Sequence, residues 1–415
     1  MKNNKIKGLF LTFISIIYGV LMLINAPPVY SSGIGERAQE AILRMRTAQF
    51  YDVRFSSNHL KVGEDLVVTG KVMILPIWPH ELGFSGIGYI NFFEPGPRLV
   101  RKETVVNGQP LFSSMIIKLG DNYEFKEVLT ARQPGTWPVG VTMNIKDIGP
   151  IVGPSIKVAI DPSNSPFTYV IKTLTGQTIN LENYGLSRAF GWSMLWVFLG
   201  IGWLYYWLIL KPTAPRLGLA YLEKEDELIT KKDTQFGLLF LGIVVILVFG
   251  GAFITSKQFP IVIPLQKTFV RIDPLAPEPA FVEAKVTKAT YNVQQRSLDF
   301  DLQVTNKGND KVYLKRFQTA NVAFLNPSAP NNQWPSDSPE VNGGELQITP
   351  SEPILAGETK TLHVKAQGSA WEVERLSTIY KETSSRFGGL LFFSDSEGRR
   401  NIIAIADQFV VPVFE

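Results

Sequence analysis

Two stretches of the chain are apolar at nearly every position. They run from Ala189 to Leu210 and from Phe236 to Thr255, and neither contains a charged residue. Because about 20 residues of helix, at 1.5 Å of rise each, cover the hydrocarbon core of a bilayer, both are long enough to cross one. The ends of the first stretch are aromatic, as in an interfacial belt, at Trp192, Trp203, Tyr205, Tyr206 and Trp207. The pattern predicts two transmembrane helices, over residues 186–210 and 236–255.

On both sides of this pair, short apolar alternations are separated by Gly and Pro turns. DLVVTGKVMIL, GIGYINFFEPGP and residues 113–145 precede it, and FVEAKVTKATYNV, SLDFDLQVTNKGND, VYLKRFQTANVAFL and AGETKTLHVKA follow it. Short strands at such spacing indicate antiparallel β-sandwiches of immunoglobulin-like or cupredoxin-like type. A helical turn is expected at Ala370–Tyr380, and a long surface loop at Asn326–Glu345, which is rich in Pro, Asn and Ser.

The N-terminus has the order of a secretory signal peptide. Lys2, Lys5 and Lys7 precede an apolar run from Gly8 to Ile24, and small polar residues follow through Ser32 and Gly33. We expect residues 1–32 to be removed. An uncleaved anchor helix is the alternative, because the apolar run approaches spanning length.

The basic residues around the two apolar stretches are distributed unevenly. Most lie in the connection between them, at Lys211, Arg216, Lys224, Lys231 and Lys232. The outer ends carry little more than Arg188 and Lys257. The positive-inside rule therefore places the loop 211–235 in the cytoplasm and two domains, 33–185 and 256–415, on the opposite side.

Composition removes several classes of function. The 415 residues include no cysteine, which excludes thiolate metal sites, and the net charge of +4 is not gathered into a nucleic-acid-binding patch. No phosphate-binding loop or nucleophile elbow is present in its required context. The apolar stretches lack the ionisable residues of a transport path, and the acidic run at residues 225–227 fits a solvated turn.

Longer phrases carry a family resemblance: ERAQEAILRMRTAQFYDV, GKVMILPIWP, INFFEPGPRLVR, YEFKEVLTARQPGTW, NIKDIGPIVGP, FPIVIPLQ and SRFGGLLFFSDSEGRRN. In this order, over the whole chain, they resemble the B subunit of particulate methane monooxygenase and of ammonia monooxygenase. The resemblance implies a mainly β fold with transmembrane α: two cupredoxin-like antiparallel β-sandwich domains joined by a two-helix transmembrane hairpin. It also implies the A and C membrane subunits as partners in a trimer of heterotrimers. The location would be the bacterial inner or intracytoplasmic membrane, with both large domains periplasmic.

Members of that family typically bind copper in the first domain through three histidines. One begins the mature chain in H-G-E-[KR], and two lie in a W-x-V-H type strand; a terminal amine with imidazoles suits copper. Here the ligand positions hold Ile34, Pro138 and Gly140, none of which has a donor side chain. A further pair found in some members falls at Gln49 and Met73, and Met73, in an alternating strand, is expected to be core.

The histidines present are expected to replace none of these ligands. His59 and His80 fit surface turns, and His363 belongs to the second domain. The loss resembles a branch of the family found in acidophilic methanotrophs. We therefore expect no catalytic, cofactor-binding or metal-binding residue in this chain, with copper held in partner subunits.

The resulting hypothesis is a structural, noncatalytic B subunit of a copper-dependent membrane monooxygenase that oxidises methane to methanol with O₂. One alternative is an ammonia-oxidising homologue. Another is an atypical copper site in this chain, built from Glu36 and the new terminal amine. A third is a free-standing membrane-anchored binding protein without partner subunits.

Overall fold

A computed structural model describes residues 41–80, 82–94, 97–173, 176–212, 229–260, 269–278, 280–381 and 385–414. By internal contacts the chain divides into two compact units. One is Asn164–Lys267, and the other combines Met1–Ser163 with Thr268–Glu415. The expected signal peptide and most of the expected cytoplasmic loop lie outside the described residues.

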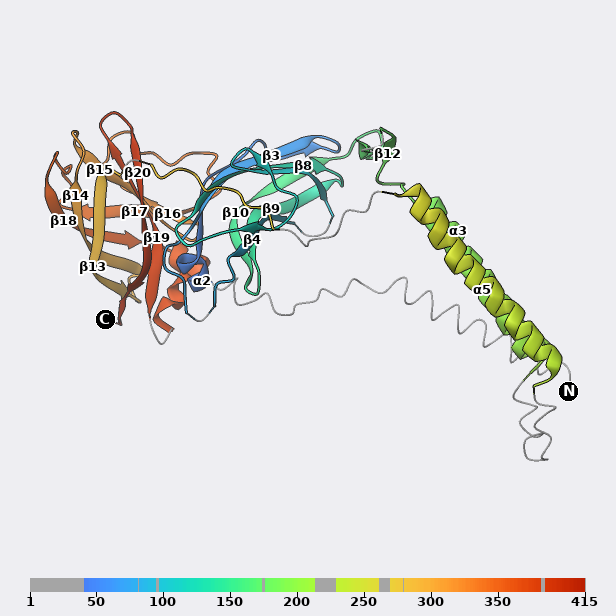
Figure 1. Ribbon diagram of the computed structural model, residues 1–415. Coiled ribbons are helices and arrows are strands. Elements are labelled where there is room, and N and C mark those ends of the chain that lie inside the picture. Colours follow the sequence, from blue (N-terminus) through green and yellow to red (C-terminus); the bar gives the residue numbers. More distant parts are fainter. Residues whose placement is uncertain are drawn as a thin grey trace, which may run out of the picture. The chain divides into compact units, whose positions relative to one another are not determined.

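The first β-domain is a sandwich of two five-stranded sheets, ordered β1-β3-β8-β5-β6 and β2-β10-β9-β4-β7 (Figure 1). Its strands are β1 (Ala48–Phe55), β2 (His59–Lys61), β3 (Asp65–Ile74), β4 (Ile87–Phe93), β5 (Leu99–Val106), β6 (Gln109–Pro110), β7 (Met115–Ile116), β8 (Asn122–Ala131), β9 (Gly135–Ile145) and β10 (Gly149–Asp161). Because side chains alternate along a strand, Val68 and Val72 of β3 face Val141 and Met143 of β9 in one buried core.

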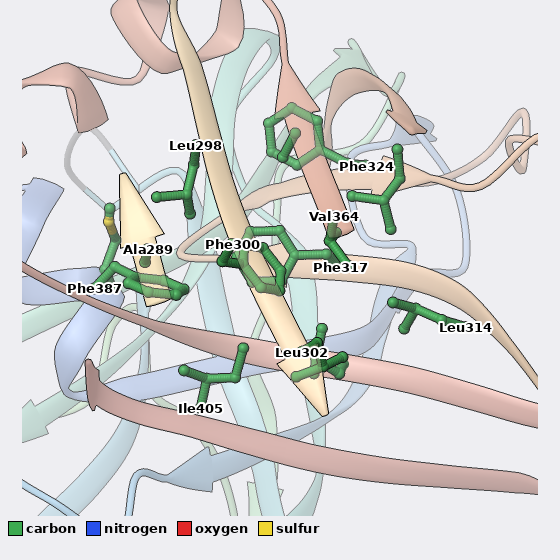
Figure 2. Close-up of a cluster of buried hydrophobic side chains, with 14 of the residues drawn as sticks. Ala289, Leu298, Phe300, Leu302, Leu314, Phe317, Phe324, Val364, Phe387 and Ile405 are labelled. Atoms are coloured by element: carbon green, nitrogen blue, oxygen red, sulfur yellow. The ribbon is translucent and has the colours of Figure 1, made fainter. Parts of the chain in front are cut away.

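The second β-domain is one nine-stranded sheet, ordered β20-β19-β15-β16-β17-β18-β14-β13-β21. Its strands are β13 (Val282–Asn292), β14 (Ser297–Asn306), β15 (Val312–Thr319), β16 (Val322–Leu325), β17 (Val341–Thr349), β18 (Thr359–Gln367), β19 (Arg386–Asp395), β20 (Arg400–Phe409) and β21 (Val411–Val413). The ring of Phe300 lies 5.4 Å from that of Phe317 and 5.7 Å from that of Phe387, although β14 is distant from β15 and β19 in the sheet order. The sheet therefore folds over its own core (Figure 2).

Two apolar helices lie between the β-domains in the sequence. Helix α3 (Leu186–Leu204) continues as the π-helix η2 (Tyr205–Leu210), and α5 covers Lys231–Gln258. Both are long and apolar enough to cross a membrane. This confirms the predicted fold class: a mainly β chain whose β-rich segments flank two helices that could span a bilayer.

Helix α5 begins before the predicted apolar stretch, within the charged connection. The Thr230 side chain accepts a hydrogen bond from the backbone N–H of Asp233, and the Asp233 carboxylate accepts one from the backbone N–H of Thr230. This capping box satisfies N–H groups that a helix start otherwise leaves unpaired, so helix formation begins in polar sequence. The sequence prediction began this helix at Phe236, because the hydrophobic pattern detects only the apolar part of the helix.

The two helices are joined at that end by polar and aromatic contacts. Tyr206 donates to Oδ1 of Asp233 at 2.6 Å, and Nζ of Lys211 lies 3.4 Å from the same oxygen. The Tyr206 and Phe236 rings stack with centroids 3.7 Å apart. These contacts close the hairpin beside the connection.

Shorter elements complete the description. A hairpin of β11 (Val170–Lys172) and β12 (Thr178–Asn180) precedes α3. The helical turn expected at Ala370–Tyr380 is confirmed as α6 (Ala370–Val373) and the 3₁₀ helix η4 (Leu376–Lys381). The surface loop expected to reach Glu345 was predicted too long, because Val341 already pairs with Val322 as the start of β17.

Candidate functional site

The two strand positions that the resemblance assigns to copper ligands, Pro138 and Gly140, lie two residues apart on β9. Pro138 is exposed and pairs with Lys157 of β10, whereas Gly140 is buried and pairs with Phe93 of β4 and Ser155 of β10. A Cβ atom placed on Gly140 would lie 2.7 Å from the Ser155 Cβ and 2.9 Å from Cε1 of Phe93. The site therefore does not fit a copper ion, since these positions offer no donor and one is closed by its neighbours. The other half of the motif, Ile34 and Glu36, lies outside the described residues.

Gln49 and Met73, the second pair of family positions, stand directly opposite each other on β1 and β3. Gln49 is fully buried, and its Nε2 donates to the carbonyl oxygens of Arg44 (2.8 Å) and Met45 (3.0 Å) at the end of α2 (Ala41–Arg46). Met73 is partly buried and packs against a cluster shared by the two β-domains. Both side chains therefore contribute to packing.

That cluster lies on the outer face of β1 and β3. Its buried members are Tyr51, Leu75, Leu390, Phe392 and Ala406. The Tyr51 and Phe392 rings meet edge-on, with centroids 6.0 Å apart. Burial raises the pKa of the Tyr51 hydroxyl to about 12, so this ring stays neutral. The first β-domain is thus covered by the second on the face where Gln49 and Met73 lie.

Ion pairs also contribute to this interface between the two β-domains. Nη2 of Arg46 lies 2.7 Å from Oδ1 of Asp407, and only 3% and 9% of their side chains are exposed. Arg386 approaches Oδ2 of Asp407 at 3.0 Å. Arg400 binds Asp52 through two hydrogen bonds, of 2.8 and 2.5 Å. Burial tends to raise the pKa of Asp52, but the hydrogen bonds and charge of Arg400 outweigh it, so that pKa is lowered overall.

Side-chain amides add two links between the domains. Nε2 of Gln318 donates to the carbonyl oxygen of Phe50, and Nδ2 of Asn321 donates to that of Val152 at 3.2 Å. Because Phe50 and Val152 belong to different sheets of the first β-domain, the second β-domain forms hydrogen bonds with both of these sheets.

Two chain segments cross between the domains. Leu43 and Met45 of α2 precede the first β-domain but lie in the core of the second. Conversely, Ile272 follows α5 and lies in the core of the first β-domain, while Val270 pairs with Met115. The two β-domains are therefore built as one unit rather than as two independent sandwiches.

The histidines lie apart from these positions. Nε2 of His59 is 2.8 Å from Oδ2 of Asp161, and Nδ1 of His363 is 2.9 Å from Oδ1 of Asp301. Both imidazoles are more than half exposed, and His80 is also exposed. Each described histidine is thus a single surface donor beside at most one carboxylate, and the fold does not bring the three together.

One group of carboxylates has the spacing of a metal site. Ligand atoms of Asp310, Asp395 and Glu397 lie within 4.8 Å of one another. However, Arg399 donates to Asp395 at 2.6 Å and to Asp310 at 2.9 Å, and its Nε lies 3.5 Å from Glu397. The guanidinium of Arg399 therefore already lies among the three carboxylates as their shared counter-ion, and we interpret the group as a structural turn.

A buried acid in the first β-domain was not predicted. Glu127 of β8 is fully buried, its Oε1 lies 3.4 Å from the Thr104 hydroxyl, and its Oε2 has no hydrogen-bond partner among the described residues. Burial raises its pKa to about 7, although Arg101 and Thr104 lower it in part. Arg101 lies over the Tyr89 ring, 5.1 Å from its centroid, and donates to Asn91, so it bridges the two sheets near this acid.

With this geometry established, comparison with known proteins identifies the family. The model of the monooxygenase B-subunit protein family matches residues 35–414. The chain belongs to this family of membrane monooxygenase subunits. The particulate methane monooxygenase alpha subunit of Methylococcus capsulatus strain Bath is 35% identical over 402 residues, which cover 95% of this chain and 96% of that protein. The resemblance found in the sequence motifs is thereby confirmed, and membership of a subunit family implies partner subunits.

Solved structures show weaker similarity. The cupredoxin domain of amoB from Nitrosocaldus yellowstonii is 19% identical, covers 32% of this chain and 99% of that domain, and gives a TM-score of 0.24. The adhesin InvE of Yersinia pseudotuberculosis is 8% identical and covers 87% of this chain and 60% of the adhesin, with a TM-score of 0.18.

Sequence reasoning missed the contact between the two β-domains. A signal was present in β1, where Ala48, Gln49, Phe50 and Tyr51 are consecutive residues without charge, and all four are buried. A strand with large side chains facing both ways is typical of one covered on both faces. Arg46 and Arg400 gave no such signal, because their partners Asp407 and Asp52 lie more than 300 residues away.

Proposed function

We propose that this chain is the structural, noncatalytic B subunit of a copper-dependent membrane monooxygenase complex that oxidises methane to methanol with O₂. The observation that carries the proposal is the lack of metal-ligand side chains at two positions of β9. Pro138 offers no donor atom for copper, and Gly140 is enclosed by Ser155 and Phe93. Copper is assigned to the A and C partner subunits, and with it the oxidation of the substrate. No step of the reaction is assigned to residues of this chain.

What the chain contributes is a stiff support for those partners. Arg46, Asp407 and the apolar cluster around Tyr51 make the two β-domains one unit. That unit is connected to the helical pair twice, because the chain leaves it after Ser163 and re-enters it at Thr268.

The topology follows the charge distribution. Residues 33–185 and 256–415 are assigned to the periplasmic side of the bacterial inner or intracytoplasmic membrane, and residues 211–235 to the cytoplasm, with residues 1–32 as the signal peptide. The assembly is a trimer of heterotrimers with the A and C partner subunits. Protease added to right-side-out spheroplasts should cut the β-domains and spare the loop; early cleavage at Lys231 would invert this topology.

The partner assignment is tested by isolation. A C-terminal affinity tag on the chain, in mild detergent, should recover two polytopic membrane proteins in equal amounts. Recovery of a monodisperse single chain would instead support the free-standing binding protein. Membranes holding the complex should oxidise methane; faster oxidation of ammonia would favour the ammonia-oxidising homologue.

The noncatalytic assignment needs a separate measurement. The full chain, purified without partners and equilibrated with Cu(II) and a competing chelator, should retain far less than one copper ion per chain. Retention of one copper ion per chain would instead support a copper site in this chain, built from Glu36 and the terminal amine. Loss of that ion in Glu36→Gln would then identify its ligand.

A further inference from the structure

The helical pair contains a groove at the end opposite the Tyr206–Asp233 contact. It has a volume of about 680 Å³ and lies between the first half of α3 and the second half of α5. Its walls include Trp192, Trp196, Val248, Gly251 and Ala252. Because Gly251 has no side chain, Trp192 packs closely against α5 along this wall: a Cβ atom there would lie 2.9 Å from the Trp192 ring. The two tryptophans meet edge-on, with centroids 5.9 Å apart.

The groove changes from apolar to polar along its length. Its polar end is lined by Arg188, Thr255 and Gln258, which lie where α3 begins and α5 ends. Arg188 contacts the Phe259 ring, with Cζ 5.5 Å from the centroid, and forms no ion pair within the part of the chain that the structure describes. The first turn of α3 contains no acidic side chain. This end therefore presents an uncompensated positive charge.

The length of the groove matches one leaflet of a bilayer. From Gln258 to Val248 the helix rises about 15 Å, at 1.5 Å per residue. The hydrocarbon core of a bilayer is about 30 Å thick, so the groove is as long as one acyl layer. The groove is confined to one half of the helical pair. The other half is filled by aromatic contacts, such as that between Trp203 and Phe240 at 4.7 Å.

We propose that this groove binds one phospholipid with an anionic headgroup. Arg188 holds the phosphate, while an acyl chain lies against Trp192, Trp196 and Val248. An arginine fork is suited to phosphate oxygens, and the tryptophans suit the boundary between headgroups and acyl chains. The inference rests on the proposed function in one respect, namely that α3 and α5 cross a membrane. A lipid held here would fill a gap that the two helices leave open.

The test uses the full chain in its complex, released from detergent micelles in native mass spectrometry after incubation with equal amounts of phosphatidylglycerol and phosphatidylcholine. The unmodified complex should retain one phosphatidylglycerol per chain. Arg188→Gln should reduce that retention at least about tenfold, the factor a hydrogen bond to a charged group supplies. Lys257→Gln is the matched control, because Lys257 is a basic residue at the same helix end that does not line the groove, and it should change nothing.

A second variant tests the apolar part. Ala252→Leu fills the groove and should abolish retention of either lipid. Equal retention in Arg188→Gln and the unmodified complex would overturn the proposal. So would disulfide trapping of Ala252→Cys to a cysteine introduced in a partner helix, because the groove would then hold protein; this chain has no other cysteine. If the chain resists carbonate extraction and recovers its partners but shows no lipid preference, only the lipid inference fails. If carbonate releases the chain, the membrane assignment fails with it.

Discussion

The chain lacks donor histidines at two places in its first β-domain, and the two places differ in what replaced them. On β9, Gly140 is enclosed by Ser155 and Phe93, and the exposed Pro138 pairs with Lys157 at the surface. On β1 and β3, Gln49 supports the end of α2, and Met73 packs against the contact with the second β-domain. At the first place a side chain on Gly140 has no room, and at the second the side chains form part of the contact between the β-domains.

This difference indicates where the stability of the chain is concentrated. The interface combines a buried charge pair with an apolar cluster, whereas the β9 positions lie outside this interface, Pro138 exposed and Gly140 buried beside Ser155 and Phe93. Substitutions at the interface should therefore affect the whole unit formed by the two β-domains. Substitutions at the β9 positions should change stability only near the substituted residue. The introduction of histidine ligands there should be limited by the space around Gly140.

The largest effect is expected for Asp407→Ala. Removing this carboxylate takes from Arg46, which is 3% exposed, the anion that lies 2.7 Å from its Nη2. Breaking a buried pair in this way costs about 3–5 kcal/mol. Thermal unfolding of the full chain in detergent should show a large fall in Tm, and limited proteolysis should separate the two β-domains.

A matched control is Glu283→Ala, which removes the partner of Lys307 in a pair that is more than half exposed. Exposed pairs contribute about 0–1 kcal/mol, so Tm should barely change. Equal shifts for the two variants would show that the Arg46–Asp407 contact does not hold the interface.

The second prediction concerns pH and the buried acid on β8. Burial raises the pKa of Glu127 to about 7, so the folded protein holds this proton more tightly than the unfolded chain does. The contribution is therefore favourable at pH 4 and is lost as the pH rises through about 7. Glu127→Gln should match the unmodified chain near pH 4 and exceed it by about 3 kcal/mol near pH 8. Unfolding midpoints across this pH range measure the difference; a constant offset would mean that Glu127 does not titrate there.

Ligand restoration on β9 is the third prediction. Gly140→His forces a side chain into the space of Ser155 and Phe93, and overpacking of this kind costs about 1–3 kcal/mol. Pro138→His replaces an exposed residue and should cost less. Unfolding of the two variants should therefore differ. Neither alone should retain copper against a chelator, since each supplies one imidazole. A stable Gly140→His variant would show that Phe93 moves aside.

The sequence predicted the architecture well wherever periodicity carried the information. The two apolar helices and strands such as β3 and β14 could be located from their patterns alone. Helix ends could not, because the capping contact of Thr230 with Asp233 depends on side chains in a charged segment. The loop ending at Glu345 was predicted too long because a parallel pairing, Val322 with Val341, has no local signal.

The candidate site shows a sharper limit. The family motifs singled out Pro138, Gly140, Gln49 and Met73 as positions of interest. The sequence could not show that Gly140 is enclosed by its neighbours. It also could not show that Gln49 and Met73 stand opposite each other on paired strands. Composition could not find Glu127 either, although the alternation of Tyr123, Phe125, Glu127 and Leu129 along β8 turns that side chain inward. Contacts between distant segments, such as Arg400 with Asp52, become visible only in the folded chain.

The smallest effect is expected at His59, and it addresses whether a surface histidine substitutes for the missing ligands. His59 lies on β2, which is paired with β10, so β10 separates it from the ligand positions on β9. Its Nε2 is engaged with Asp161 at 2.8 Å, with both side chains at least half exposed. A copper ion would need two or three nitrogen donors within about 2 Å, the bond length typical for imidazole on a comparable divalent ion. The neighbouring group supplies one carboxylate instead. His59→Gln should therefore change the free energy of unfolding by less than about 1 kcal/mol, and should leave the copper content and methane oxidation of the complex unchanged. A loss of copper from the complex with unchanged Tm would show that His59 binds the metal and that this chain is not merely structural.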